Sequence, residues 1–314
     1  MDDIDMFLQN IRKNRGRLEN TPNMIGGASA EKAWNGIKLR LKKTASTSQD
    51  NNGGAVGAVD AEEISPLRSK FVLDNDFYDF DKDRVEGSFK ENEVWAAYGG
   101  VDGMPRLYAL VHSVVSQEPF NLSISWLDIT NDEEPATMKW VDSGFSKTSG
   151  RFSIGERMIN TKALKLFSHR LKCTKDAEGF IHIYPTKGDV WALYTNWSPS
   201  WGDEDDWDDD EEEWNEFEVV EVVEDFDTEV GVMVLPLVKV PGFKAVFRRD
   251  SDQLAFSVKD LLKFSHQVVY HRLTGQEGEN VPEDCLELDP AALSRELCGD
   301  LSEDELLTED EMSE

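Results

Sequence analysis

Two short sequence strings occur twice in this chain at nearly the same interval, and this repetition limits its possible folds more than any other feature. Trp95 and Trp191 lie at the same place in the first pair of strings, 96 residues apart. His169 and His266 end the second pair, 97 residues apart. The strings are VWAAY (94–98), VWALY (190–194), KALKLFSH (162–169) and KDLLKFSH (259–266). This period is the size of a small domain and exceeds the repeats of solenoids, so we expect a duplicated domain.

Apolar residues within each repeat follow the period of β-strands. Leu122, Ile124 and Trp126 alternate with serine residues, which indicates a half-buried strand. The nearly continuous apolar run at 231–240 indicates a strand covered on both faces, in which Pro236 marks a bulge or an edge. The predicted fold class is mainly β, a β-rich α+β fold. It has two related, small, barrel-like lobes from an internal duplication, each with a short helix.

The predicted helices begin at residues that favour helix N-termini. Ser257 and Asp260 have the spacing of a reciprocal capping pair ahead of the second FSH string. Asn160 or Thr161 is expected to cap the matching helix of the first repeat. Asp289 followed by proline predicts a further helix that ends near Leu297.

The predicted domain organisation follows the shifts in composition. Residues 1–70 contain low-complexity stretches that bury too little apolar surface to fold, so we expect a disordered arm with a basic amphipathic segment. The first β-rich repeat is expected at 71–175 and the second at 176–299. The second carries an acidic insertion at 203–229, and residues 300–314 form an acidic tail.

Charge is distributed very unevenly along the chain, whose net charge is −30. Residues 203–229 contain 17 acidic residues and residues 300–314 contain 8, and neither segment contains Lys or Arg. The segment Arg12–Lys43 instead has 9 basic residues against Glu19 and Glu31. Because nucleic-acid binding needs clustered basic residues, the sequence disfavours direct nucleic-acid binding except weakly through Arg12–Lys43.

The sequence contains no recognisable reaction centre. Three cysteines without CxxC spacing argue against a disulfide framework or a zinc site, and we expect no metal and no cofactor. The aspartates at 79, 81 and 83 have the spacing of a calcium loop, but Arg84 replaces the required glycine and Lys90 the required glutamate. No apolar run is long enough to span a membrane. We therefore expect no enzymatic activity, and we interpret His169 and His266 as residues fixed by hydrogen bonds at equivalent structural corners.

The acidic run at 203–213 is the first candidate binding element. Asp208, Asp209 and Asp210 lie at its centre, and Trp207 and Trp214 add aromatic contact area. Neighbouring carboxylates repel each other by about 1 kcal/mol even in water, so the run should be extended. It is interpreted as a solvated loop, as a docking tract for a basic partner such as a histone tail, or as a mask for the basic segment Arg12–Lys43.

The repeated aromatic residues are the second candidate. Trp95 and Tyr98 in the first repeat match Trp191 and Tyr194 in the second. Aromatic residues at strand ends of small barrels can cage a methylated lysine by cation–π attraction. The alternative interpretation places these side chains in the core.

Several longer motifs together resemble one known family. They are FYDFDKDR (77–84), DGMPRLYAL (102–110), SGF (143–145), IYPTKGDVWALYTNWSPSW (183–201), PLVKVPGFKAVF (236–247), FSHQV (264–268) and LTGQEGENVPEDCLELDPAAL (273–293). The chain is similar over roughly 71–297 to a plant domain of unknown function that typically follows a J domain in DnaJ-like proteins. The resemblance implies a plant source and a non-enzymatic module, and it supplies no catalytic residues. The tripeptide His-Pro-Asp does not occur in the sequence, so we expect no J domain.

These observations lead to two expectations about function. The first is a non-enzymatic protein-interaction module that binds a basic or chromatin-associated protein such as a histone or a transcription factor. The alternative is an adaptor without a J domain in Hsp70 and DnaJ chaperone assemblies. A nuclear or cytoplasmic location is expected, with the nucleus favoured.

Overall fold

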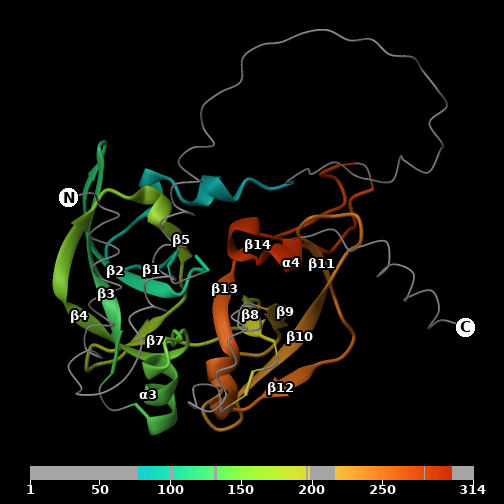
Figure 1. The fold of residues 1–314 in the computed structure, drawn as a ribbon. Helices are drawn as coiled ribbons and strands as arrows, with labels where there is room; N and C mark the ends of the chain where they lie inside the picture. The colour runs from blue at the N-terminus through green and yellow to red at the C-terminus, as the bar shows by residue number, and fades with distance from the viewer. Residues whose placement is uncertain are drawn as a thin grey trace, which may run out of the picture.

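The computed structural model describes residues 77–298, except 100–101, 131–132, 196, 199–215 and 279. The expectations for the arm at 1–70, its basic segment and the tail at 300–314 lie outside the described residues. Two curled β-sheets lie side by side and form two lobes (Figure 1). The predicted mainly β fold is confirmed.

The first lobe contains a seven-stranded antiparallel sheet in the order β5-β1-β2-β3-β4-β7-β6. Its strands are β1 (Val94–Ala97), β2 (Leu107–Gln117), β3 (Phe120–Ile129), β4 (Gly150–Thr161), β5 (Phe167–Arg170), β6 (Thr174–Lys175) and β7 (Ile181–Ile183).

The second lobe contains an eight-stranded sheet in the order β13-β8-β9-β10-β11-β15-β14, with β12 paired to β10. Its strands are β8 (Val190–Tyr194), β9 (Phe217–Val222), β10 (Val232–Lys239), β11 (Val246–Arg249), β12 (Leu254–Phe256), β13 (Phe264–Val268), β14 (Tyr270–Arg272) and β15 (Leu286–Leu288).

The two sheets have the same strand order once β12 is set aside. In each, the strand of the VWA string pairs with the strand of the FSH string, which aligns Ala96 with His169 and Ala192 with His266. In each, the last two strands of the repeat close the opposite edge. The repeated strings therefore mark a duplicated topology.

Strand pairing changes two of the expected boundaries. β7 pairs with β4, so the first sheet continues to Ile183 and the repeats meet between Ile183 and Val190, not at 175. The segment 217–222 within the expected acidic insertion is β9, which lies between β8 and β10. Its two acidic residues, Glu218 and Glu221, lie among buried phenylalanine and valine residues, and pairing with β8 and β10 makes the segment a core strand.

Short helical segments surround the sheets. The 3-10 helices η4 (Leu164–Leu166) and η7 (Val258–Lys263) precede the two FSH strands. The Ser257 N–H donates to the Asp260 carboxylate over 2.8 Å, as expected for a cap. In the first repeat the Thr161 hydroxyl accepts from the Ala163 N–H over 3.2 Å, but Ala163 is itself the N-cap of η4 and no side chain of a described residue caps that helix. The cap expected from Asn160 or Thr161 is therefore wrong. The single helix expected from Asp289 is instead two, η8 (Pro290–Ala292) and α4 (Arg295–Cys298), because Leu293 is extended between them.

Pro236 lies in the central strand β10, at a position where a backbone N–H would have no partner among the described strands. Its carbonyl accepts from the Asp250 N–H over 2.9 Å, on the side of β10 that faces β11 and β12. β12 pairs with 232–234 and β11 with 237–239, so Pro236 faces the gap between these two strands. No described strand therefore loses a hydrogen bond to it.

Both sheets have packed cores on both faces. Trp95 and Trp191 lie on equivalent faces, which η4 and η7 cover. The opposite face of the second sheet forms the largest buried cluster, and it includes Trp140 from α3 (Pro135–Asp142) of the first lobe. The two lobes therefore share a core.

Candidate functional site between the two lobes

The repeated aromatic residues do not form a surface cage. Trp95, Trp191 and Tyr194 have 2%, 1% and 3% of their surface exposed, and they pack inside the cores. Tyr98 is half-buried beneath the Arg84 side chain. The cage interpretation is wrong for the three buried residues, because strand pairing turns their rings inward.

The candidate residues Trp207, Trp214, Asp208, Asp209 and Asp210 lie outside the described residues. The structure does place both ends of their segment. β8 and β9 are adjacent antiparallel strands, and the Thr195 N–H donates to the Glu216 carbonyl over 3.1 Å just beyond them. The acidic run is therefore the connection of a β-hairpin.

The two predicted histidine corners are built in the same way. In each, a serine hydroxyl lies 3.0 Å from Nδ1 of the following histidine, from Ser168 to His169 and from Ser265 to His266. The His266 Nε2 lies 2.9 Å from the Ala292 carbonyl, so Nε2 carries the proton and Nδ1 accepts. Burial lowers the pKa of His266 to about 3 and that of His169 to about 4. Both imidazoles are therefore neutral near pH 7.

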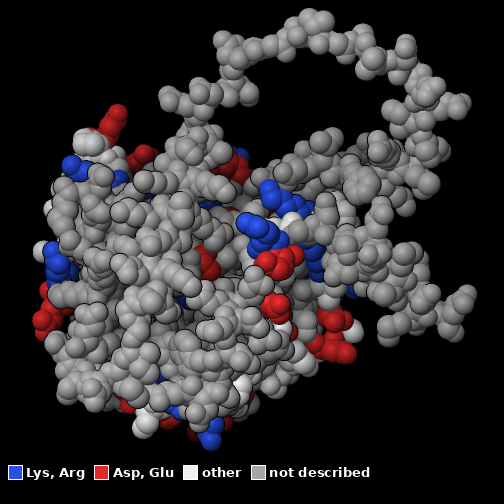
Figure 2. Space-filling model, in the orientation of Figure 1, with Lys and Arg blue, Asp and Glu red and all other residues white. Residues whose placement is uncertain are grey.

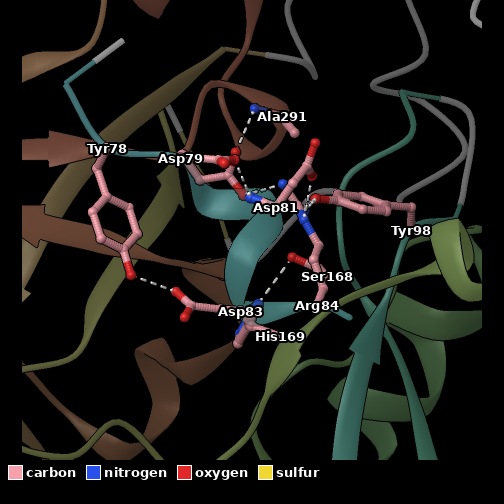
Figure 3. Close-up of polar contacts among 10 residues, drawn as sticks. Tyr78, Asp79, Asp81, Asp83, Arg84, Tyr98, Ser168, His169 and Ala291 are labelled. Carbon is pink, nitrogen blue, oxygen red and sulfur yellow. Dashed lines mark hydrogen bonds and ion pairs between the residues drawn. The ribbon is translucent and has the colours of Figure 1, made fainter. Parts of the chain in front are cut away.

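The first histidine belongs to a chain of hydrogen bonds that joins the lobes. The Arg84 Nη1 donates to the Tyr98 hydroxyl, which also contacts the Ser168 hydroxyl (Figure 3). The His169 Nε2 lies 3.1 Å from Gln267 Oε1 on the second lobe. β5 and β13, the edge strands that carry these two residues, are thus linked through side chains.

Arg84 itself bridges the two lobes. Its Nη2 lies 3.2 Å from a carboxylate oxygen of Asp289 on the second lobe, and its Nε donates to Asp81 over 2.9 Å. Burial raises the pKa of Asp289, and Arg84 opposes this rise. Figure 3 shows Arg84 between η2 (Phe80–Asp83) and the ring of Tyr98.

A second buried arginine occupies the equivalent corner of the other repeat. Arg106 is the last residue of the β1–β2 connection, and its Nε and Nη2 donate to the Ser265 hydroxyl over 3.0 and 2.9 Å. Its guanidinium carbon lies 5.5 Å from the ring centre of Tyr194 and 5.4 Å from that of Phe217. Its Nη1 donates to Asp102 over 2.7 Å. Burial alone would raise the pKa of Asp102, but Arg106 lowers it below its usual range.

The two corners, which we call the arginine corners, therefore share one design. Each combines the tyrosine of the VWAxY string, the Ser-His pair of the FSH string, an arginine from an earlier segment, and an aspartate. The members are Arg84, Tyr98, Ser168, His169 and Asp289 in one, and Arg106, Tyr194, Ser265, His266 and Asp102 in the other. Sequence reasoning found the histidines but missed both arginines and both aspartates, although all four lie in the motifs FYDFDKDR, DGMPRLYAL and LDPAAL.

The hydrogen bonds and ion pairs of the arginine corners have a structural role. Ser265 and His266 are fully buried and Ser168 is 5% exposed, so a substrate has no path to either hydroxyl. A serine nucleophile needs a histidine that accepts its proton near neutral pH, and burial makes both imidazoles weak bases. The corners hold the lobes in one arrangement.

Residues 77–89, which we call the strap, cross from the second lobe to the first (Figure 1). At one end the Phe77 N–H donates to Glu287 over 2.8 Å and the Tyr78 ring stacks on His271 at 4.4 Å. At the other end Phe89 stacks on Trp95 at 4.0 Å. The FYDFDKDR motif is thus an interlobe clamp, a role that its sequence did not reveal.

The aspartates of the strap serve local hydrogen bonds. The Asp79 carboxylate accepts from the Asp81 N–H, Asp81 pairs with Arg84, and Asp83 accepts from the Tyr78 hydroxyl (Figure 3). Within the described residues, no group of three or more His, Cys, Asp or Glu is placed to hold a metal ion. None of the helices in this part of the chain has the length and apolar character needed to cross a membrane.

Comparison with known proteins places the chain in a family. The family described as Domain of unknown function (DUF3444) matches residues 68–277. No curated protein and no solved structure matches the chain. The folded unit extends past the matched segment, because β15 and Asp289 follow residue 277 and complete the second lobe. The chain belongs to the DUF3444 family, over a segment that includes the whole strap and ends in the loop after β14.

Proposed function

We propose that this protein is a non-enzymatic interaction module that binds a basic, chromatin-associated protein through its acidic residues 203–213. The observation that supports this most strongly is the place of the run between paired strands. Its ends are held by the Thr195–Glu216 hydrogen bond, beside the corner where Arg106 fixes Tyr194 and Phe217. A charged segment on a rigid base can present its carboxylates without disturbing the fold.

The first lobe contains the equivalent connection without an acidic run, and the two connections can be compared. The equivalent connection in the first lobe, between β1 and β2, is much shorter and supplies Asp102 and Arg106 to the lobe interface. The connection in the second lobe is longer and has ten carboxylates in the eleven residues 203–213. This extra length is not needed to close the hairpin, so we assign it to a partner with the opposite charge.

The charge of the chain supports a protein partner over a nucleic acid, because the net charge is −30 and the acidic run would repel phosphates. Figure 2 shows Lys and Arg side chains beside Asp and Glu side chains among the described residues visible on this face. The closed arginine corners support a role without catalysis or a cofactor. Nuclear location is part of the proposal, because histones and transcription factors are the basic partners it names.

The test is binding to purified core histones over a series of salt concentrations. It compares the full chain with a variant in which the ten carboxylates of 203–213 are replaced by their amides at unchanged length. We expect the variant to lose most of the salt-sensitive binding. A matched control replaces acidic residues of the tail at 300–314 instead. Equal binding by wild type and the 203–213 variant would contradict the proposal.

A second function is supported by the family motifs, which resemble the domain that follows J domains. In that function the β-rich lobes act as an adaptor in Hsp70 and J-protein assemblies. Affinity purification from plant cells separates the two. Histones or transcription factors retained only by the chain with intact 203–213 support the first function. Hsp70 and J proteins retained equally by both forms support the second.

A further inference from the structure

β12 (Leu254–Phe256) is a short strand at an open edge of the second sheet. It pairs only with β10, and none of the described strands pairs with its outer side. The outer side of the neighbouring β11, in contrast, is paired with β15. β12 is therefore an edge strand, whereas β11 is followed in the sheet by β15 and β14.

The hydrogen-bond pattern of β10 shows which backbone groups of β12 point outward. The Met233 carbonyl accepts from the Val223 N–H over 2.9 Å, on the β9 side. Because successive residues of a strand direct their N–H and C=O to opposite sides, Val232 and Val234 face β12. Their partners Phe256 and Leu254 therefore bond inward, and the N–H and C=O of Ala255 point outward.

Exposed apolar side chains lie beside this edge. Val230 is 77% exposed, Leu254 is 39% exposed and Val258 is 40% exposed. Gly231 packs closely against Phe256 and Ser257, which brings Val230 to the Val258 end of β12. Apolar side chains on both ends of an open strand are a feature that folded proteins usually avoid, because such edges attract other strands.

The charges around the edge select the kind of strand that can add to it. Asp250 and Asp252 precede β12, and Glu229 lies beside Val230 at its other end. The segments 227–230 and 250–257 contain no Lys or Arg. Of the two lysines in η7, Lys263 is paired with Glu218 over 2.6 Å and covers the Phe256 ring on the packed face of the sheet. Lys259 is exposed directly after Val258, but Asp227, Glu229, Asp250 and Asp252 outnumber it around the edge. An acidic segment would be repelled here and a basic one attracted.

We infer that the outer edge of β12 binds an extended, basic segment of a partner protein by strand addition, with alternate apolar side chains resting on Leu254 and Val258. The backbone of Ala255 provides the hydrogen bonds, and the flanking carboxylates select lysine or arginine. This inference rests on the proposed function in one respect, since both assign a basic protein as the partner. It names a different contact from the acidic run at 203–213.

The experiment uses the full chain and, as probe, a short peptide of alternating lysine and valine. Hydrogen exchange measures protection of the Ala255 amide, and fluorescence anisotropy measures affinity. Ala255→Pro removes the outward N–H at an edge position that tolerates proline, and Ala255→Val is the matched control that keeps it. We expect protection at Ala255 on binding, affinity reduced about tenfold or more by Ala255→Pro, and little change with Ala255→Val. A peptide N-methylated at alternate residues should not bind.

The outcomes separate this inference from the proposed function. Bound peptide without protection of Ala255 in the wild-type chain overturns the strand-addition site, even if Ala255→Pro fails to fold. Protection of Ala255 before any peptide is added shows that another segment of the chain or a second copy occupies the edge, and this also overturns it. Histone binding that depends on 203–213 and not on Ala255 keeps the proposed function and rejects β12 as the site.

Discussion

Arg106 is a buried residue of the first lobe that contacts the second lobe through both hydrogen bonds and aromatic rings. It is the last residue of the β1–β2 connection, and its guanidinium carbon lies 5.5 Å from the ring centre of Tyr194 and 5.4 Å from that of Phe217. Its carboxylate partner Asp102 belongs to the same connection, so the positive charge of Arg106 is neutralised by a residue of the β1–β2 connection itself. Removing one member of a buried pair leaves the other uncompensated, which costs much more than the pair contributes.

Replacing Arg106 by Met should therefore lower the free energy of unfolding by about 3–5 kcal/mol. The matched control is Arg170→Met, because Arg170 also pairs with a carboxylate, Glu93, but its side chain is 61% exposed. That change should cost about 1 kcal/mol or less. Urea denaturation of both variants measures the difference, and equal costs would show that Arg106 does not fix the interface.

The neutral state of His266 predicts how stability depends on pH. Its pKa is about 3 in the folded chain and about 6.5 when unfolded, so the unfolded state binds an extra proton between these values. Stability should fall as pH is lowered from about 6.5 to about 5, by about 1.4 kcal/mol per pH unit for this residue. His266→Gln should be less stable at pH 7 and should show a weaker pH dependence. Parallel pH curves for the two proteins would contradict this.

At the scale of elements, local sequence signals predicted the pieces that depend on neighbours in the chain. The Ser257–Asp260 pair is such a signal, and its hydrogen bond appears in the structure. The alternation at 122–126 predicted the strand β3 but not its burial, because Ser123 and Ser125 are buried as well as the apolar residues that alternate with them. β9 was assigned to an insertion because Glu218 and Glu221 continue the run of acidic residues in 203–229. β12 was not predicted, since its short apolar stretch becomes a strand only through pairing with β10.

The close contact between Gly231 and β12 predicts that a side chain at position 231 would destabilise the fold. This residue has φ of +104°, and an added Cβ would lie 2.0 Å from the Phe256 carbonyl oxygen. Gly242 has φ of +82° but open space around it, so it is a matched control for backbone strain alone. Gly242→Ala should cost about 1–2 kcal/mol, and Gly231→Ala about 1–3 kcal/mol more. Chemical denaturation measures both, and equal costs would mean that β12 moves away freely.

At the scale of the whole molecule, the duplication could be predicted from sequence and the union of the lobes could not. The repeated strings correctly marked equivalent strands, because the residues of each string pack in the same way within their own lobe. The residues that join the lobes, Arg84, Arg106 and Trp140, have no counterpart in the repeated strings. A pattern search within repeats has no signal for contacts made between them. The same limit applies to the candidate site, where the sequence singled out the histidines and tyrosines but neither the arginines nor the aspartates.

Replacing Trp140 tests whether the core shared by the two lobes stabilises both of them. It lies on α3 of the first lobe, is 3% exposed, and packs 5.7 Å from the Tyr194 ring of the second. Trp140→Ala should cost about 3–5 kcal/mol. It should also increase amide exchange in β8 and β9 of the second lobe. Loss of protection confined to the first lobe would show that α3 does not stabilise its neighbour.

The central claim is that the strap, the arginine corners and Trp140 make two duplicated lobes into one cooperative body. Differential scanning calorimetry of the full chain tests it most directly, with Arg106→Met as the comparison. We predict one transition for the wild-type chain, with equal calorimetric and van't Hoff enthalpies, and a broadened or split transition for the variant. Two separate transitions in the wild-type chain would contradict the claim, because they would show that each lobe folds and unfolds on its own.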